Sequence, residues 1–193
     1  YLYDASWGAF VYAIPGEEYG TLWGYASVRE KATPVYYDKE KTQLSHIEYS
    51  GRPLVGTNGR YIRSGARTDL GNIYPDWFGG VNNAFNYKDL TFSFLVDFRK
   101  GGLIHSVTNM FGKYTGILEE TAATNANGKN IRDPLSEGGG ILIDGAVYGK
   151  VLSDGTIQFI DAAGANVTTP VENTTYSDAN AWAYGFYGKN ELT

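Results

Sequence analysis

The 193-residue sequence contains no cysteine, a single methionine and no run of 18 apolar residues. The missing cysteines exclude disulfides and thiolate metal sites. The missing apolar run excludes a transmembrane helix, and the first residues do not have the form of a signal peptide. The chain starts at Tyr1 rather than at methionine, so we expect a mature, cleaved or excised piece of a protein.

An excess of basic residues is also missing. The formal net charge is −5 and the isoelectric point is near 5.0. Lysine and arginine are scattered along the chain, whereas a nucleic-acid partner requires a clustered basic surface. We therefore expect no nucleic-acid partner.

No group of residues has the spacing of a catalytic or metal site. His46 and His105 lie in loop-like segments, without paired cysteines or an HExxH spacing. We interpret both as solvated loop histidines. The sequence thus predicts no catalytic residue, no metal and no cofactor, and we expect that the chain is not an enzyme.

Aromatic residues and glycine are abundant. The chain has 16 tyrosines and 25 glycines, and aromatics make up 15% of it. This composition, with apolar residues in alternate positions, indicates an all-β protein with many turns and no long helix. The alternation predicts strands near residues 8–14, 19–28, 78–87 and 90–100.

Two long polar stretches separate or follow these strands. Residues 29–72 and 103–193 are expected to be loops, and loops of this length are usually functional or disordered. Two Asp-Gly pairs predict hairpins at 141–147 and 150–160 inside the second loop. By contrast, only Lys88 and Asp89 connect the last two predicted strands.

The segment "FNYKDLTFSFLVDFRKGG" (85–102) alternates almost cleanly, with Leu95 as the exception. One face carries Leu90, Phe92, Phe94, Val96 and Phe98, and the other carries Thr91, Ser93, Asp97 and Arg99. The alternation alone fits both a soluble sandwich, with the apolar face toward a core, and a membrane strand, with that face toward lipid.

Two further observations favour the membrane. A two-residue turn beside loops of tens of residues is typical of outer-membrane barrels. Leu90–Phe98 has about the length that a tilted strand needs to cross a bilayer. We therefore predict that Leu90, Phe92, Phe94, Val96 and Phe98 face lipid, and that Thr91, Ser93, Asp97 and Arg99 face the lumen of a barrel.

Residues 70–102, "LGNIYPDWFGGVNNAFNYKDLTFSFLVDFRKGG", closely resemble a signature in the C-terminal half of SusC/RagA TonB-dependent outer-membrane transporters. "PGEEYGTLWGY" (15–25) resembles an upstream element of the same family, before a long external loop. The resemblance implies a 22-stranded barrel around a plug and a SusD-like surface lipoprotein that covers it. It also implies import of an oligosaccharide or a peptide, driven by the TonB complex.

The chain departs from that family in length, because the plug, the TonB box and the final strands are absent. The resemblance therefore implies a partial antiparallel transmembrane β-barrel with long extracellular loops: an internal segment, residues 1–193, of the barrel domain in the bacterial outer membrane. Two alternatives remain at this point. One is a soluble β-rich glycan-binding module, and the other is a β-sandwich glycosidase, for which no pair of carboxylates is evident.

Aromatic residues outside the alternating strands are the candidates for contact with a substrate or a partner protein. They are Trp7, Trp77, Trp182, Tyr184 and Tyr187. Tyrosine and tryptophan rings stack on sugars and are enriched in protein interfaces. An aromatic girdle at the membrane surface, or packing among the loops, is the competing interpretation.

Overall fold

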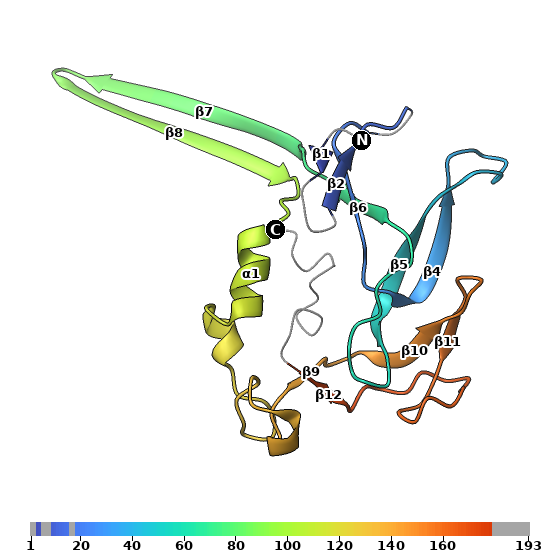
Figure 1. Cartoon of the computed structure of the whole chain (residues 1–193). Coiled ribbons are helices and arrows are strands. Elements are labelled where there is room, and N and C mark those ends of the chain that lie inside the picture. Colours follow the sequence, from blue (N-terminus) through green and yellow to red (C-terminus); the bar gives the residue numbers. More distant parts are fainter. Residues whose placement is uncertain (1–2, 5–8, 16–17, 179–193) are drawn as a thin grey trace.

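The computed structural model describes residues 3–4, 9–15 and 18–178, and this part of the chain is mostly β-sheet with one short α-helix (Figure 1). The expected all-β class is confirmed at this level. Among the described residues, every helix is too short and too polar to cross a membrane.

The first sheet has four antiparallel strands in the order β1-β2-β3-β6. The strands are β1 (Tyr3–Asp4), β2 (Ala9–Tyr12), β3 (Thr21–Gly24) and β6 (Thr68–Asn72). Ala9, Val11 and Leu22 form its buried core. Ile73 and Leu103, which lie just before and just after the longest hairpin of the chain, pack against this core and anchor that hairpin.

The second sheet has the order β11-β10-β5-β4. Its strands are β4 (Arg29–Tyr36), β5 (Leu44–Val55), β10 (Val147–Val151) and β11 (Ile157–Phe159). The pairing of β10 with β5 is parallel, with Val147 opposite Leu54 and Tyr148 opposite Val55. This sheet therefore joins two segments that are almost a hundred residues apart in the sequence.

Two core clusters hold the second sheet. Val28, Leu54 and Val147 form one cluster; Val55, Ile143, Ala146, Tyr148 and Ile160 form the other. We call the sheet β11-β10-β5-β4 with these two clusters the head. The head has its own hydrophobic core, and burial of these side chains stabilises its fold.

Residues 29–72 differ from the expected irregular loop, because β4, β5 and β6 lie there. Polar residues on both faces of β4, Pro34, and the Gly51-Arg52-Pro53 break in β5 hide the alternation in the sequence. Proline is tolerated in β4 because this strand lies at the edge of its sheet.

Residues 103–140 also differ from the expected loop. They contain α1 (Val107–Thr115) and the 3-10 helices η1 (Glu119–Ala122) and η2 (Leu135–Glu137). The Ser106 hydroxyl accepts a hydrogen bond from the Asn109 N–H at 3.1 Å, and Gly116 ends the helix with φ of 80°. Both residues are ordinary helix caps that the sequence displays.

One of the two expected short hairpins is not present. Residues 141–147 turn at Asp144-Gly145, but β9 (Ile141–Leu142) pairs with β12 (Tyr176–Ser177) instead of with β10. The prediction was wrong because an Asp-Gly turn fixes the local bend and not the later partner. Within 150–160 the structure does have a hairpin, formed by β10 and β11.

The last sheet is a two-stranded hairpin of β7 (Pro75–Tyr87) and β8 (Leu90–Gly101). It extends away from the other sheets as a long arm (Figure 1). Among the described residues, neither strand pairs with any strand besides its partner. Both outer edges of the arm therefore carry unpaired backbone groups within this part of the chain.

Candidate functional site

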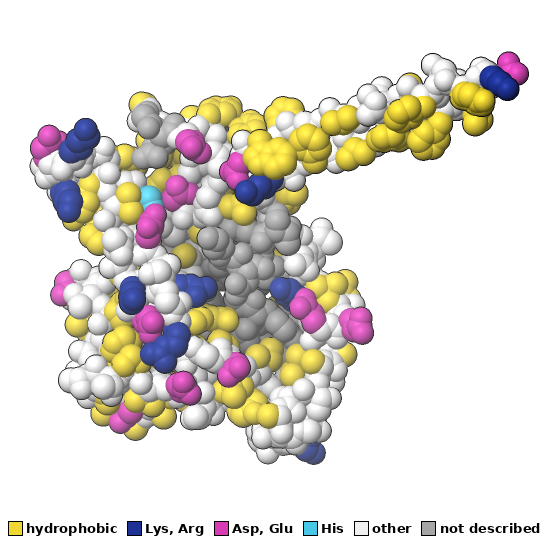
Figure 2. All heavy atoms as spheres, turned by 180° about the vertical axis from the view of Figure 1, so that it is seen from behind, with side chains coloured by type: hydrophobic (Ala, Val, Ile, Leu, Met, Phe, Trp, Pro, Cys, Tyr) yellow, Lys and Arg dark blue, Asp and Glu magenta, His cyan; other side chains and the backbone are white. Residues whose placement is uncertain are grey.

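The hairpin β7–β8 segregates its side chains onto two faces. Cross-strand pairs such as Val81–Val96 and Phe85–Phe92 place their side chains on the same side of the sheet. The resulting apolar face comprises Trp77, Val81, Phe85, Tyr87, Leu90, Phe92, Phe94, Val96 and Phe98, with Asn83 as its polar exception and Lys100 at its end. Figure 2 shows hydrophobic side chains gathered along the arm, with charged residues at its far end.

This apolar face is uncovered by the described part of the chain. Phe92 is 60% exposed and Leu90 68% exposed, and every residue of β8 is classed as exposed. Contiguous exposed apolar surface of this kind marks a site of contact with another molecule or a membrane. Whether lipid covers it remains a prediction.

The opposite face of the hairpin is more polar. Asp97 and Arg99 lie there opposite Gly80 and Phe78, and Thr91 and Ser93 lie opposite Asn86 and Ala84. The Thr91 hydroxyl donates a hydrogen bond to Asn86 Oδ1 at 2.8 Å. Leu95 and Phe78 are the apolar exceptions, at 62% and 79% exposure.

The turn and the base of the arm differ in composition. Lys88 and Asp89 form the two-residue turn, with Lys88 at φ of 53°. At the other end, Gly101, the last residue of β8, and Gly102 have φ of 79° and 84°, and the strand ends within one residue of the position that the sequence indicated.

Trp77 is the one expected contact residue that the structure describes. It lies near the start of β7, half exposed, and its ring meets Phe98 edge-on at 5.2 Å between centroids. This position belongs to the apolar face of the hairpin. Trp7, Trp182, Tyr184 and Tyr187 lie outside the described residues.

A second feature is a cavity of about 610 Å³ between β4, β5 and β6. Polar and aromatic residues line it, and the ones that matter for its chemistry are Arg29, His46, Glu48, Tyr49, Tyr61 and Asp69. A volume of this size is within the range of small-molecule sites, about 300–1,000 Å³. The cavity thus has the size and the mixed lining of a ligand site.

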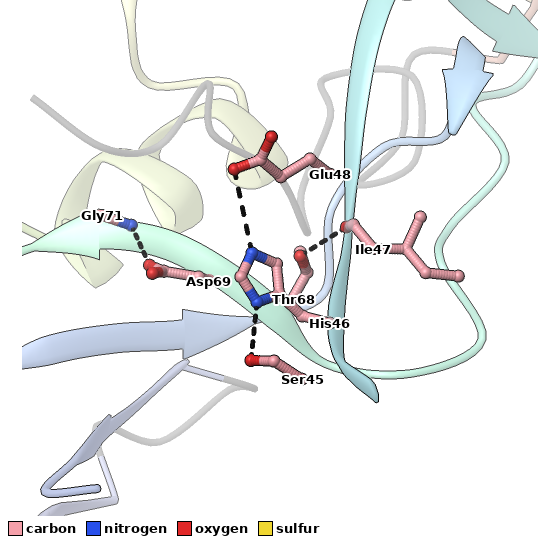
Figure 3. Close-up of polar contacts among 7 residues, drawn as sticks. All are labelled: Ser45, His46, Ile47, Glu48, Thr68, Asp69 and Gly71. Atoms are coloured by element: carbon pink, nitrogen blue, oxygen red, sulfur yellow. Dashed lines mark hydrogen bonds and ion pairs between the residues drawn. The ribbon is translucent and has the colours of Figure 1, made fainter. Parts of the chain in front are cut away.

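His46 occupies one wall of this cavity (Figure 3). Its side chain is only 9% exposed, and Nδ1 lies 3.0 Å from the Ser45 hydroxyl. The Trp23 ring packs edge-on against the imidazole at 5.4 Å. These contacts hold the ring so that Nε2 points toward Glu48, whose Oε1 is 4.0 Å away.

The neighbouring strand β6 supplies the other polar groups at this wall. The Thr68 hydroxyl donates to the Ile47 carbonyl at 2.7 Å and ties β6 to β5. Asp69 Oδ1 accepts a hydrogen bond from the Gly71 N–H at 2.7 Å (Figure 3). Two carboxylates, from Glu48 and Asp69, therefore line the same cavity as the imidazole.

Two tyrosines add aromatic surface to the cavity. Burial raises the pKa of the Tyr49 phenol. Burial also raises the pKa of Tyr61, against the opposing effect of the nearby Arg29 charge. Both rings are thus neutral at physiological pH, with one side packed against a core cluster of the head.

Both histidines differ from the expected solvated loop residues. His46 lies in β5 and is nearly buried. His105 lies just before α1, and its Nε2 is buried with no hydrogen-bond partner among the described residues. Burial lowers the pKa of His105. The sequence did contain a signal for His46, since "HIE" at 46–48 places His46 and Glu48 on one face of a strand.

Within the described part of the chain, no three His, Asp or Glu residues are arranged to hold a metal ion. Comparison with known proteins does not add a family, because no protein-family model and no curated protein matches the chain. The exposed apolar face of the hairpin and the lined cavity are therefore the two features from which a function is argued.

Proposed function

We propose that the chain is a segment of a SusC/RagA-type TonB-dependent transporter in the bacterial outer membrane, and that β7–β8 is part of its barrel wall. The observation that carries the proposal is the uncovered apolar face of this hairpin beside a more polar opposite face. Membrane barrels alternate lipid-facing and lumen-facing residues in this way.

The dimensions of the apolar face agree with this proposal. From Trp77 to Tyr87 there are ten residue steps, which at about 3.3 Å per residue span about 33 Å. At a strand tilt of about 40° the height is about 33 Å × 0.77, or about 25 Å, which is the height of the apolar band of outer-membrane barrels. Trp77 and Tyr87 lie at its two ends, where interfacial aromatics are found.

The charged residues of the hairpin avoid the central part of the apolar face. Lys88 and Asp89 are at the turn, and Asp97 and Arg99 are on the polar face. Lys100 shares the side of Trp77 but is followed at once by Gly101, at the end of the strand. Its ammonium can extend to the membrane surface, so no charge is forced into the centre of the bilayer.

The unpaired edges of β7 and β8 also fit a barrel. A bare strand edge in lipid leaves N–H and C=O groups unsatisfied, so only closed barrels are stable there. We infer that further strands of the longer transporter pair with both edges. The head then lies among the long external loops, with Lys88-Asp89 as a periplasmic turn.

The remaining parts of the proposal follow from the family resemblance. The transporter imports an oligosaccharide or a peptide, a SusD-like surface lipoprotein covers it, and the TonB complex acts through regions that this chain lacks. The chain itself carries out no covalent chemistry.

One observation favours a different function. The head has two core clusters, and the cavity of about 610 Å³ lies between its strands β4 and β5 and the neighbouring β6. A folded core and a lined cavity are what a soluble β-rich glycan-binding module requires. In that case the apolar face of the hairpin would be covered by protein rather than by lipid.

Site-directed spin labelling of the full-length transporter in lipid nanodiscs tests the proposal. The 193 residues contain no cysteine, so Phe92→Cys, Phe94→Cys and Val96→Cys each add a single labelling site within them. Thr91→Cys and Ser93→Cys are the matched controls on the other face, and Asn127→Cys, on an exposed loop, reports water.

We expect labels at Phe92, Phe94 and Val96 to be relaxed by oxygen, which concentrates in lipid, and poorly by a water-soluble nickel reagent. Labels at Thr91 and Ser93 are expected to show lower oxygen accessibility. If all five positions behave like Asn127, the hairpin lies in water and the barrel-wall proposal is wrong.

A further inference from the structure

The cavity between β4, β5 and β6 contains a polar gap that a ligand atom would fill. His46 Nε2 and Glu48 Oε1 are 4.0 Å apart, which is beyond a hydrogen bond of about 2.7–3.2 Å. Ser45 holds the other ring nitrogen, and Nε2 makes no hydrogen bond to the described residues. Two polar atoms at such a separation are commonly bridged by a water molecule, whose place a ligand group with matching hydrogen bonds can take.

The site at His46 and Glu48 combines a buried imidazole with a carboxylate. The His46 side chain is nine-tenths buried, and its orientation is fixed by Ser45 on one side and by the Trp23 ring on the other. Glu48 is the adjustable member, with 66% of its side chain exposed. The site therefore pairs a rigid nitrogen with a mobile carboxylate at the mouth of a cavity.

A group that donates several hydrogen bonds fits the space between Nε2 and the Glu48 carboxylate best. A carboxylate only accepts, and Nε2 accepts in one of the two neutral tautomers, the one in which Nδ1 donates to the Ser45 hydroxyl. We assign this tautomer to the ligand-bound site. A primary ammonium has three donors, whereas a hydroxyl has one. An ammonium is thus able to donate to Nε2 and to Glu48 at the same time.

The charge of the lining favours the same group. Arg29 contributes one positive charge and Glu48 and Asp69 two negative charges, so the lining is −1 with neutral His46. The Arg29 guanidinium donates to the Gly51 carbonyl at 2.7 Å. The guanidinium keeps its charge in this hydrogen bond, so the formal charge of the lining, −1, is what favours a cation over an anion.

We infer that this cavity binds a primary ammonium group through His46 Nε2 and the Glu48 carboxylate, with the aromatic surfaces of Tyr49 and Tyr61 available to the rest of the ligand. The ammonium belongs to the amino terminus of a peptide or to an amino sugar. The inference rests on the proposed function only in taking this ligand to be the imported substrate.

Isothermal titration calorimetry of the full-length protein in detergent tests this binding. The probes are glucosamine with N-acetylglucosamine, and triglycine with N-acetyl-triglycine, so that each amine has a partner without the charge. We expect at least one amine to bind ten or more times more tightly than its acetylated partner. The pair that shows the difference distinguishes the sugar source from the peptide source.

The variant Glu48→Gln keeps the size of the side chain and removes its charge, and the exposure of Glu48 makes misfolding a minor concern. It is expected to weaken binding of the amine at least tenfold and to leave the acetylated probe unchanged. Glu40→Gln, on an exposed residue between β4 and β5, is the matched control and should bind like the unaltered protein.

Equal binding of the amine and its acetylated partner, an unaltered affinity in Glu48→Gln, or no heat with any probe at millimolar concentration would each overturn the inference. Spin labelling keeps the two proposals separate. If the hairpin faces lipid but the protein does not prefer the amines, only the ammonium-site inference is wrong. If the protein prefers the amines but the hairpin lies in water, the barrel-wall proposal is wrong and the ammonium site belongs to a soluble module.

Discussion

In the head, Leu54, Val147 and Tyr148 have no exposed surface, whereas in the hairpin every residue of β8 is exposed. Both regions are β-structure with alternating side chains, yet only the head covers its apolar residues with other residues of this chain. An isolated two-stranded hairpin is at best marginally stable in water. The hairpin therefore requires a covering surface that the described residues do not supply, whereas the head covers its own apolar residues.

The largest effect that separates the two regions is expected from core truncation. Leu54→Ala opens a cavity in the head, which costs about 2–5 kcal/mol in the free energy of unfolding. Val96→Ala in the hairpin is the matched change. Its cost is expected to be much smaller, because lipid chains fill the space beside a lipid-facing residue.

Hydrogen exchange measured by mass spectrometry on the full-length protein in nanodiscs checks this prediction. Peptides that cover β5 and β10 should exchange faster in Leu54→Ala, while peptides of β7 and β8 should change little in Val96→Ala. A large increase in the hairpin peptides would show that Val96 packs in a rigid protein core, and would break the comparison.

The next effect is expected from a charge placed in the hairpin. Phe94 lies near the middle of β8, opposite Asn83. Phe94→Arg should cost about 2–4 kcal/mol, the cost of arginine at the lipid face near the midplane of a membrane barrel. Ser93→Arg is the neighbouring control on the polar face, and its cost should be much lower.

Urea titration of the protein folded into lipid vesicles measures both values. If Ser93→Arg destabilises the protein as much as Phe94→Arg does, the two faces of the hairpin are equivalent and the assignment of lipid to one of them fails.

A smaller effect is expected from the partly buried hydrogen bonds of a tyrosine in the head. The Tyr148 hydroxyl lies 2.6 Å from the Thr175 hydroxyl and accepts from the Thr174 N–H at 3.0 Å. Tyr148→Phe removes these hydrogen bonds, and because Thr174 is exposed and Thr175 partly exposed, the cost is that of an ordinary hydrogen bond, about 0.5–1.5 kcal/mol. Tyr87→Phe, on an exposed hairpin residue, should cost nothing measurable, and exchange rates of the 171–178 region would show the difference.

The hairpin was the part of the fold most visible in the sequence. Its two strands, its turn at Lys88-Asp89 and the sorting of Phe92 and Ser93 onto opposite faces all follow from local alternation. Such patterns are local, so the sequence displays them directly.

The head was largely invisible for the opposite reason. The parallel pairing of Leu54 with Val147 joins distant segments, and no local pattern specifies it. In β4 and β5, polar residues and prolines mask the alternation. The cavity forms where β6, which pairs with β3 in the other sheet, lies against β5. No local pattern specifies that contact, so His46 and Asp69 could not be brought together from the sequence, although the His46–Glu48 spacing was there to be read.

The smallest effect is expected from an ion pair at the edge of the head, and among the described residues it has no counterpart in the hairpin. A hydrogen bond from Arg52 to Glu30, with 2.9 Å between Nε and Oε2, lowers the pKa of Glu30. A carboxyl whose pKa is lower in the folded state stabilises the fold above its unfolded pKa, and this contribution is lost as pH falls through the folded pKa. Arg52 is partly exposed, so the pair is worth less than about 1 kcal/mol.

The variant Glu30→Gln should therefore exchange hydrogen slightly faster than the unaltered protein in β4 and β5 peptides at pH 7, after correction for the intrinsic exchange rate. At pH 3 the two proteins should differ less, and a difference that grows on acidification would show that the Glu30 carboxylate opposes the fold instead of stabilising it.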